Sequence, residues 1–272
     1  TWNSLAALSL RTTSTMARSK GKEVLAFSLG IILIACLLQI AGYIKGDAIV
    51  FPSVWEIVKA FLRLIVTGRT YLLIWTTLKH LLMSMAVSTA IGILMGLAQG
   101  MSGFVRNLFK PLIIMLRSLP MIVLIVVIMV MAQYKWVPVI APSLVLIPII
   151  SEATSEGFQR IDRELVDVYR MNSNFNFKVL VHVYLPLMAG YLKQAYVNAV
   201  DMGIKLTVST EYLVQTRNSL GKAVHSSGYF NEYQDIYAYA LVMILLILLV
   251  SELPMWIGRR ANQASQKYWI EA

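Results

Sequence analysis

The chain has 272 residues, of which 58% are hydrophobic and only 14% are charged. An average soluble domain is about 45–50% apolar and about 25% charged, so this composition excludes a disordered chain and argues against a soluble globule. The net charge of +10 would suit nucleic-acid binding, but the apolar fraction indicates a membrane protein with basic cytoplasmic loops. The one cysteine, Cys36, excludes a disulfide framework and a cysteine-rich metal site.

Six stretches of the sequence are candidates for membrane-spanning helices, which need roughly 20 predominantly apolar residues. They are residues 24–44, 71–98, 119–133 (which can be extended backwards through 109–116), 137–150, 185–213 and 236–257. The fourth stretch is short and contains three prolines, and the fifth contains several ionisable residues. The sequence predicts an all-α, polytopic membrane protein with six transmembrane helices.

Basic residues are distributed unequally between the predicted loops. With the N-terminus inside, 14 of them lie in cytoplasmic segments and seven in outer segments, which predicts that both termini are cytoplasmic. The expected organisation is a cytoplasmic segment at 1–23, a transmembrane domain at 24–258 and a cytoplasmic tail at 259–272. Met16 is the expected natural start, and the first span is long enough to remain as an anchor rather than a cleaved signal peptide.

Residues 51–64 predict an amphipathic helix on the outer side, directly after the first span. Pro52 and Ser53 form a helix start with Ser53 as the N-cap. Apolar residues then recur at helical spacing, while Glu56 and Lys59 fall on the opposite side. Packing on its own bundle and a role related to substrate are both left open for this helix.

The second span contains a ladder of small residues at intervals of four. They are Ser84, Ser88, Gly92, Gly96 and Gly100. Small residues at this spacing let two membrane helices approach closely, so packing is the favoured interpretation. The hydroxyl groups of Ser84 and Ser88 are also candidates for lining a pathway.

Residues 151–186, between the fourth and fifth spans, form a long segment assigned to the cytoplasm. Helix–helix connections are commonly about two to eight residues long. Apolar residues recur at helical spacing on both sides of a polar break at 172–174, which predicts two short helices joined by a turn. Met171, Phe175 and Phe177 at this turn favour a docking element for a cytoplasmic partner over a solvated hairpin.

This segment resembles the signature loop of type I ABC-transporter permeases, the membrane subunits of binding-protein-dependent importers. The residues that match its pattern are Gly157, Ile161, Asp162, Glu164, Leu165, Arg170, Leu185 and Pro186. Asp167, the pair Val168–Tyr169 and Asn172 depart from it, although asparagine can adopt the left-handed conformation of the glycine it replaces. The resemblance implies a coupling loop at 152–185 on which ATPase subunits dock. Its expected docking residues are Asp162, Glu164, Leu165, Asp167, Arg170, Met171, Asn172, Ser173 and Phe175.

Four further motifs extend the resemblance over roughly residues 50–258. They are Phe51-Pro52-Ser53, Leu116-Arg117-Ser118-Leu119-Pro120, Val208-Ser209-Thr210-Glu211 and Ser219-Leu220-Gly221. The first is similar to the branch that imports sulfonates, taurine, nitrate and thiamine precursors. The family implies a bacterial inner-membrane complex of two permease subunits, here expected as a homodimer, with two cytoplasmic ABC ATPases and an extracytoplasmic substrate-binding protein.

The fifth span contains three ionisable residues, Asp201, Lys205 and Glu211. Such groups usually face the interior of a bundle or a water-filled cavity. Asp201 and Lys205 are four positions apart, so a structural ion pair and a place on the pathway are both left open. A cation such as Lys205 beside a translocation route would suit an anionic substrate. The pathway candidates are therefore Ser84, Ser88, Asp201, Lys205 and Glu211.

The sequence contains no Walker A phosphate loop and no H-E-x-x-H motif, so no enzyme activity, metal or cofactor is predicted. ATP hydrolysis is expected on a separate subunit. The predicted function is a permease subunit of an ABC importer, which forms the route for a small anionic or heterocyclic nutrient by alternating access. A transport-inactive membrane scaffold with a permease-like fold and an ion-coupled secondary carrier stay open as alternatives.

Overall fold

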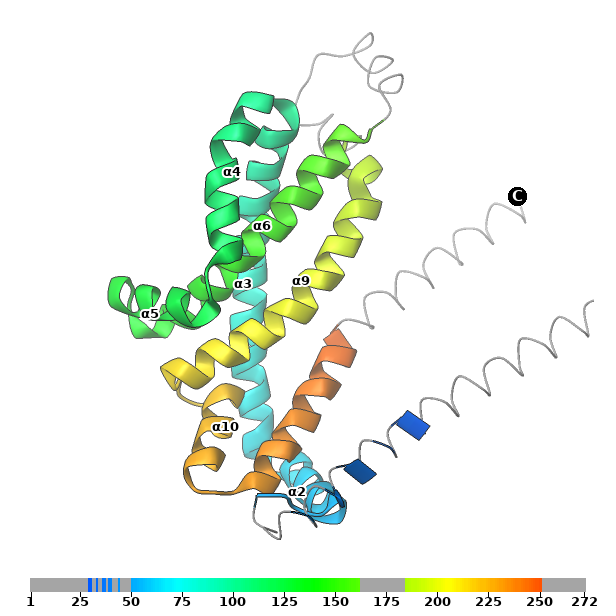
Figure 1. The fold of residues 1–272 in the computed structure, drawn as a ribbon, viewed down its shortest axis with the longest axis vertical. Coiled ribbons are helices and arrows are strands. Elements are labelled where there is room, and N and C mark those ends of the chain that lie inside the picture. Colours follow the sequence, from blue (N-terminus) through cyan, green and yellow to red (C-terminus); the bar gives the residue numbers. More distant parts are fainter. Residues whose placement is uncertain are drawn as a thin grey trace, which may run out of the picture.

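The computed structural model describes residues 50–161 and 184–250, together with scattered helical positions between residues 29 and 44. All regular structure in these ranges is helical, as the sequence predicts (Figure 1). In chain order the elements are α2 (Val54–Val66), α3 (Gly68–Met101), α4 (Gly103–Ser118), α5 (Met121–Met131), the 3-10 turn η1 (Tyr134–Trp136), α6 (Val137–Gln159), α9 (Leu185–Val214) and α10 (Leu220–Tyr229). A final helix, Tyr233–Val250, follows α10.

Three of the described helices are long and apolar enough to cross a membrane: α3, Tyr134–Gln159 and Tyr233–Val250. A fourth candidate is the pair α4 and α5, which is bent by 106°. The bend lies at Leu119, whose backbone is extended (φ −70°, ψ 130°) because the following proline disfavours a helical residue before it. Of the six predicted spans, 24–44 falls mostly outside the described residues, and α9 does not pass the same test for a span.

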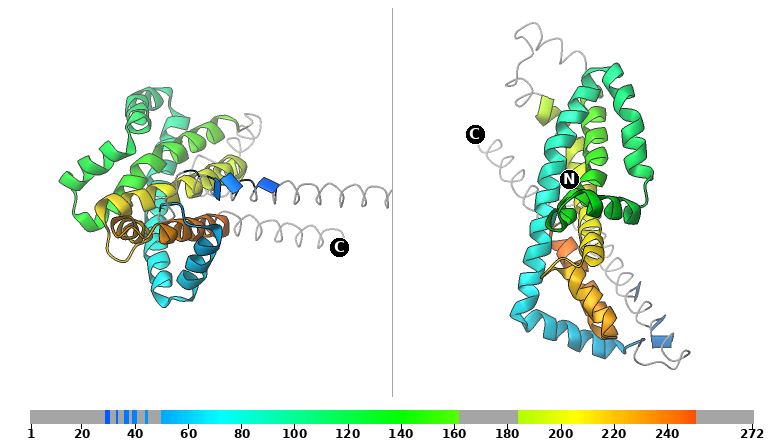
Figure 2. Two further views of the ribbon diagram at one scale, coloured as in Figure 1. Left: turned by 60° about the horizontal axis from the view of Figure 1, so that its bottom comes forward. Right: turned by 90° about the vertical axis from the view of Figure 1, so that its left-hand side faces the viewer.

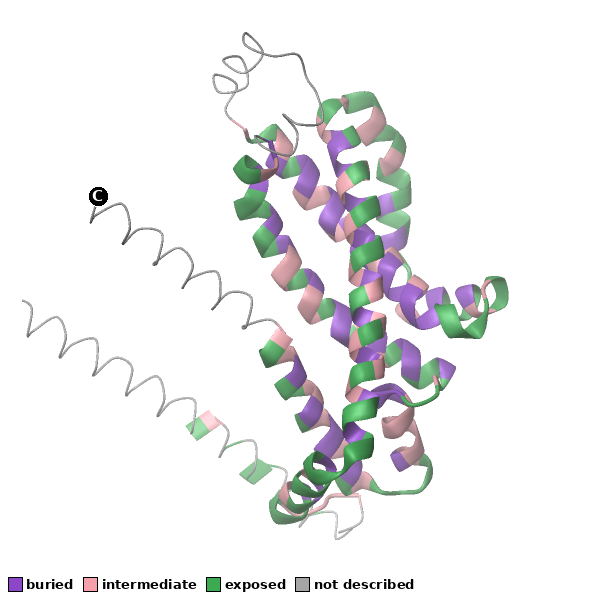
Figure 3. Cartoon of the chain, turned by 180° about the vertical axis from the view of Figure 1, so that it is seen from behind, coloured by how far each residue is buried: buried purple, intermediate pink, exposed green. Residues whose placement is uncertain are grey.

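The centre of the molecule is formed by α3, α6 and α9, and the contact of α3 with α6 is the most extensive among the described helices. Buried positions follow the faces on which these helices meet (Figure 3). The ladder of small residues on α3 lies in this contact. A Cβ atom on Gly92 would meet Ile150, and one on Gly96 would lie 2.5 Å from the Ser151 carbonyl oxygen. Small residues therefore let the two backbones approach closely.

The two serines of the ladder are fully buried in the same contact, each at 0% exposure. Ser88 Oγ donates a hydrogen bond to the Ser84 carbonyl oxygen (2.6 Å), and Ser143 Oγ of α6 donates to the same oxygen at 3.3 Å. Hydroxyl groups that bond to backbone carbonyls of their own or the facing helix satisfy their polarity within the bundle.

The predicted outer helix is α2, which lies across one end of the bundle (Figure 2). Its capping box is formed as the sequence suggests, because Ser53 Oγ accepts from the Glu56 amide and Glu56 Oε2 accepts from the Ser53 amide. The apolar face buries Ile57, Ala60 and Leu64. Ala60 and Leu64 pack in a cluster with residues of α3, α10 and the final helix. In this structure α2 is thus packed on its own bundle.

Helix α6 extends beyond the predicted span at 137–150 and ends at Gln159. The first part of the segment that the sequence assigns to the coupling loop therefore belongs to α6, a helix of the bundle. Ser151 and Thr154 lower the hydropathy there, but both are fully buried. The Ser151 carbonyl oxygen and the Thr154 side chain lie beside Gly96. The connection between α6 and α9 spans residues 160–184, and residues 162–183 are outside the described part of the chain.

Candidate functional site

Helix α9 carries a row of polar side chains along one face. Its members are Gln194, Asn198, Asp201, Lys205, Ser209 and Tyr212, at intervals of three or four residues, and we call this row the α9 polar stripe. Asp201 is half-buried and the other members are exposed. Met188, Leu192, Ala199 and Ile204 occupy the opposite, buried face, so the helix is oriented with its apolar face packed into the bundle.

The α9 polar stripe limits which environment can lie against this face of α9. A helix of 30 residues is about 45 Å long, enough to cross a bilayer. Ionisable groups at membrane depth are costly against lipid and face a bundle interior or water. For α9 as the span that the sequence predicts, the exposed surface at Lys205 would face water or another protein surface rather than hydrocarbon.

Toward the N-terminus of α9, the stripe opens into a cavity of about 500 Å³ between α6 and α9. We call it the α6–α9 groove. Gln194 and Asn198 line it from α9 and are bonded to each other at 3.3 Å. Glu152 lines it from α6, and Arg117 of α4 donates to both of its carboxylate oxygens at 2.6 and 2.5 Å. This pair ties the end of α4 to α6 at the wall of the groove.

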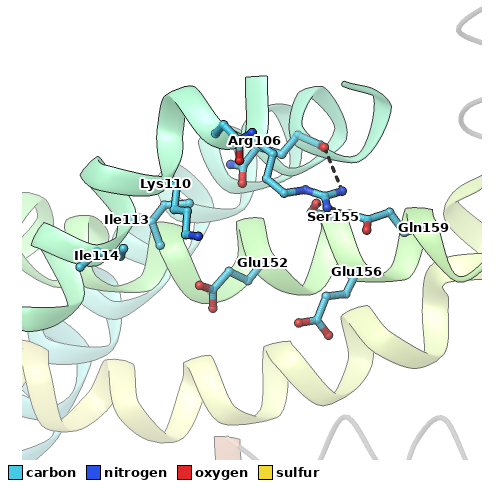
Figure 4. Close-up of a pocket in the computed structure, with 10 residues that line it drawn as sticks. Arg106, Lys110, Ile113, Ile114, Glu152, Ser155, Glu156 and Gln159 are labelled. Atoms are coloured by element: carbon cyan, nitrogen blue, oxygen red, sulfur yellow. Dashed lines mark hydrogen bonds between the residues drawn. The ribbon is translucent and has the colours of Figure 1, made fainter. Parts of the chain in front are cut away.

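A second cavity, of about 450 Å³, lies on the other side of α6, against α4 (Figure 4). Arg106 and Lys110 of α4 and Glu152 and Glu156 of α6 are among the residues that line it. Arg106 Nη2 donates to the Gln99 carbonyl oxygen at 3.5 Å. Because Glu152 and Glu156 line both cavities, α6 forms an acidic wall between them.

Glu211 is the one pathway candidate of α9 that lies off the stripe, and its side chain is fully buried. Thr77 Oγ1 of α3 donates to Glu211 Oε2 at 2.7 Å, and His80 Nδ1 lies 2.7 Å from Oε1. The Gly221 amide at the start of α10 donates to Oε2 at 3.3 Å. The carboxylate therefore joins three helices, and its acceptor capacity is used within the bundle.

Two motifs that are ten residues apart in the sequence meet at this carboxylate. A Cβ atom on Gly221 would lie 2.5 Å from both the Tyr212 amide nitrogen and the Val208 carbonyl oxygen. The Leu220 amide donates to Thr77 Oγ1 at 3.0 Å. Only a glycine fits where α10 crosses α9 so closely, which gives the Ser219-Leu220-Gly221 motif a structural reason.

The structure thus separates the five pathway candidates into two groups. Ser84, Ser88 and Glu211 lie inside packed contacts of α3, and Asp201 and Lys205 lie on the α9 polar stripe. Lys205 makes no ion pair with another described residue, so the pair with Asp201 that their spacing allows is not formed. A pathway role for any of these five residues stays a prediction.

Several residues that line the two cavities cannot be identified as site residues from the single sequence. Gln194, Asn198, Glu152 and Glu156 are ordinary polar residues, and only helical spacing relates the first two to Asp201 and Lys205. The nine predicted docking residues, from Asp162 to Phe175, all lie outside the described part of the chain. In the residues that the structure covers, no group of three or more His, Cys, Asp or Glu side chains is placed to hold a metal ion.

Residues 88–265 match the family described as a binding-protein-dependent transport system inner membrane component. The match covers well over half of the chain, so the protein belongs to this family. It is a multi-pass membrane protein and the permease subunit of an ABC importer, with the type I permease fold that its signature loop predicts.

The same fold occurs in a solved structure described as inward facing conformations of the MetNI methionine ABC transporter in a CY5 native crystal form. The similarity has a TM-score of 0.55 and covers 77% of this chain and 96% of that one. The two are 14% identical, so the similarity supports the fold and not the substrate. No curated relative matches the chain significantly.

Proposed function

We propose that this permease subunit pairs with a second copy of itself and that the α9 polar stripe lines the translocation route between them. The exposed row from Gln194 to Tyr212 is the observation that carries the proposal. In a single chain the stripe would face lipid, which charged residues such as Lys205 avoid. A water-filled route shared by two subunits removes that cost and explains why the polar residues face away from the bundle.

In the proposed assembly, six spans cross a bacterial inner membrane with both termini in the cytoplasm. The spans are the segment 24–44, α3, the bent pair α4–α5, α6, α9 and the final helix. An extracytoplasmic binding protein delivers substrate at the end formed by α2 and α10. Two separate ABC ATPases dock on the opposite end, through the residues around 162–175.

The connectivity suggests how ATP hydrolysis would reach the route. Residues 160–184 join α6 directly to α9, and these two helices form the walls of the α6–α9 groove. A displacement of a docked ATPase would therefore be transmitted to both walls at once. Packed helices move as rigid bodies, so the groove would open toward one side of the membrane and close toward the other.

The proposed substrate is a small anionic or heterocyclic nutrient, as in the branch that imports sulfonates, taurine, nitrate and thiamine precursors. Lys205 supports the anionic class, because it is exposed on the stripe and makes no ion pair with a described residue. A lysine ammonium group that lines a water-filled route attracts anions and repels cations.

The route can be tested without knowing the substrate by labelling single cysteines with a charged, membrane-impermeant thiol reagent. In a Cys36→Ser background, Asn198→Cys, Lys205→Cys and Ser209→Cys should react in the assembled transporter, with rates that change when ATP is added. The matched control is Leu94→Cys on α3, because Leu94 is 70% exposed in the single chain, shares its helix face with exposed Val87 and Ile91, and should face lipid.

Equal labelling of Leu94→Cys and Lys205→Cys would show that the stripe is not an aqueous route. Co-purification of a stoichiometric ATPase, with hydrolysis stimulated by a binding protein, would exclude the transport-inactive scaffold. Uptake driven by an ion gradient in the absence of any ATPase would instead establish the ion-coupled carrier.

A further inference from the structure

A polar cavity of about 400 Å³ lies at the end of the molecule where α3 begins and α10 lies. Four parts of the chain surround it: the first turn of α3, the turn between α9 and α10, α10 itself, and the start of the final helix. It shares no lining residue with the α6–α9 groove. We call it the outer cationic pocket.

Three cations from three different elements converge on this pocket: Arg69 of α3, Arg217 of the turn and Lys222 of α10. None of them forms an ion pair with another residue in the described ranges. The pocket also contains Asp235 and Glu232, but the Asp235 carboxylate is already bound by Arg63 of α2.

The charges of the pocket therefore do not balance. With Asp235 neutralised by Arg63, Glu232 is the remaining carboxylate against three cations, so two positive charges are uncompensated. Like charges held around one cavity repel one another, and the cavity concentrates their field. An anion in the pocket would relieve this repulsion.

The pocket is made by side chains and not by the end of α10. The first amides of that helix are already used: those of Leu220, Gly221 and Lys222 donate to Thr77, Glu211 and Ser219 respectively. These bonds also fix α10 against α3 and α9. The flanking turn has left-handed backbone at Gln215 (φ 56°) and Asn218 (φ 55°), on either side of Arg217.

We propose that the outer cationic pocket binds an oxyanion, with Arg69, Arg217 and Lys222 as its charged ligands. Guanidinium groups suit this chemistry because their parallel N–H groups match two oxygens of a phosphate, sulfonate or carboxylate. The hydroxyl groups of Ser226 and Ser227 also line the cavity and add neutral donors. The oxyanion comes either from a soluble phosphate-like anion or from the headgroup of an anionic phospholipid in the outer leaflet.

The test uses the full chain in nanodiscs and radiolabelled inorganic phosphate at constant ionic strength. Discs of phosphatidylcholine alone should bind phosphate saturably, while chloride at the same ionic strength does not displace it. In a second set of discs containing phosphatidylglycerol, loss of phosphate binding identifies the lipid headgroup as the preferred ligand. Unchanged phosphate binding in those discs identifies the soluble anion.

Three variants complete the test. The double variant Arg217→Gln with Lys222→Gln should weaken phosphate binding at least about tenfold for each cation removed. The matched control, Lys59→Gln with Lys135→Gln, removes two cations that contact Trp55 and Trp136 instead, and should bind as the parent does. Glu232→Gln should tighten binding severalfold, a gain that a misfolded protein cannot produce.

The proposal is overturned if the phosphatidylcholine discs show no saturable phosphate binding. It is also overturned if the double variant binds as tightly as its control, or if Glu232→Gln does not tighten binding. Because the pocket is separate from the α9 polar stripe, these results do not depend on whether the stripe is the translocation route.

Discussion

Adding a single methyl group to Gly96 should destabilise the protein, and adding the same group to Gly190 should not. A Cβ atom on Gly96 would lie 2.5 Å from both the Ser151 carbonyl oxygen and Thr154 Cβ. Carbon atoms pack best at about 3.5–4.0 Å, so α3 and α6 would have to separate by about 1 Å. The nearest heavy atoms include backbone, which has no other rotamer to adopt.

The expected magnitude follows from two opposing effects. Overpacking of a tight interior costs about 1–3 kcal/mol, and separating the helices also strains the buried hydrogen bond from Gln99 to Ser151 (2.9 Å), worth about 1 kcal/mol. Alanine is a better helix former than glycine by up to about 1 kcal/mol. Gly96→Ala should therefore lower the free energy of unfolding by about 1–3 kcal/mol, or about 2–10 °C in melting midpoint.

Gly190→Ala is the matched control, because Gly190 lies inside helix α9 and a Cβ atom there would meet nothing within 4 Å. Only the gain in helix propensity applies, so this variant should be as stable as the parent or more so by up to about 1 kcal/mol. Thermal unfolding of the purified chain, followed by circular dichroism in one detergent, measures both. Equal midpoints for the two variants would refute the close contact of α3 with α6.

Three other substitutions probe separate features. Glu211→Ala leaves His80 without its buried partner and should lower the free energy of unfolding by about 3–5 kcal/mol, seen as a large fall in melting midpoint or loss of folded protein. Ser53→Ala removes an exposed N-cap and should lower the free energy of unfolding by about 1 kcal/mol. A decrease of more than about 2 kcal/mol in the same thermal unfolding experiment would contradict this role. Lys205→Met should reduce uptake by the assembled transporter while Lys193→Met on the same helix does not, and equal uptake by both would exclude Lys205 from the route.

Local signals in the sequence predict the helices and their packing face well. Ser53 and Glu56 are close together in the chain, so the capping box that starts α2 can be read directly. The same holds for the ladder on α3, because a period of four fixes one face of a helix whatever that face contacts. The sequence cannot identify α6 as the contacting helix, since Gly96 and Thr154 meet only through the tertiary fold.

Side chains that meet over long sequence distances are beyond this kind of prediction. Glu211 is recognisable as an ionisable residue in an apolar stretch, but Thr77 and His80 lie more than 130 residues earlier and give no sign of being its partners. For the same reason the sequence groups Glu211 with Lys205, although one is buried and the other exposed. Hydropathy also assigns residues 151–159 to a loop, because it does not register that Ser151 and Thr154 are buried against glycine.

Helix α5 has a consequence for the surrounding lipid. Its 11 residues, Met121–Met131, are all apolar and span about 16 Å, roughly half of a hydrocarbon core about 30 Å thick. Ile122, Val126 and Val130 are exposed on it, and the 106° bend turns α5 away from the direction of α4 (Figure 1). An apolar helix of this length cannot cross the hydrocarbon core by itself, so its exposed side chains need a cover of acyl chains or of a neighbouring subunit.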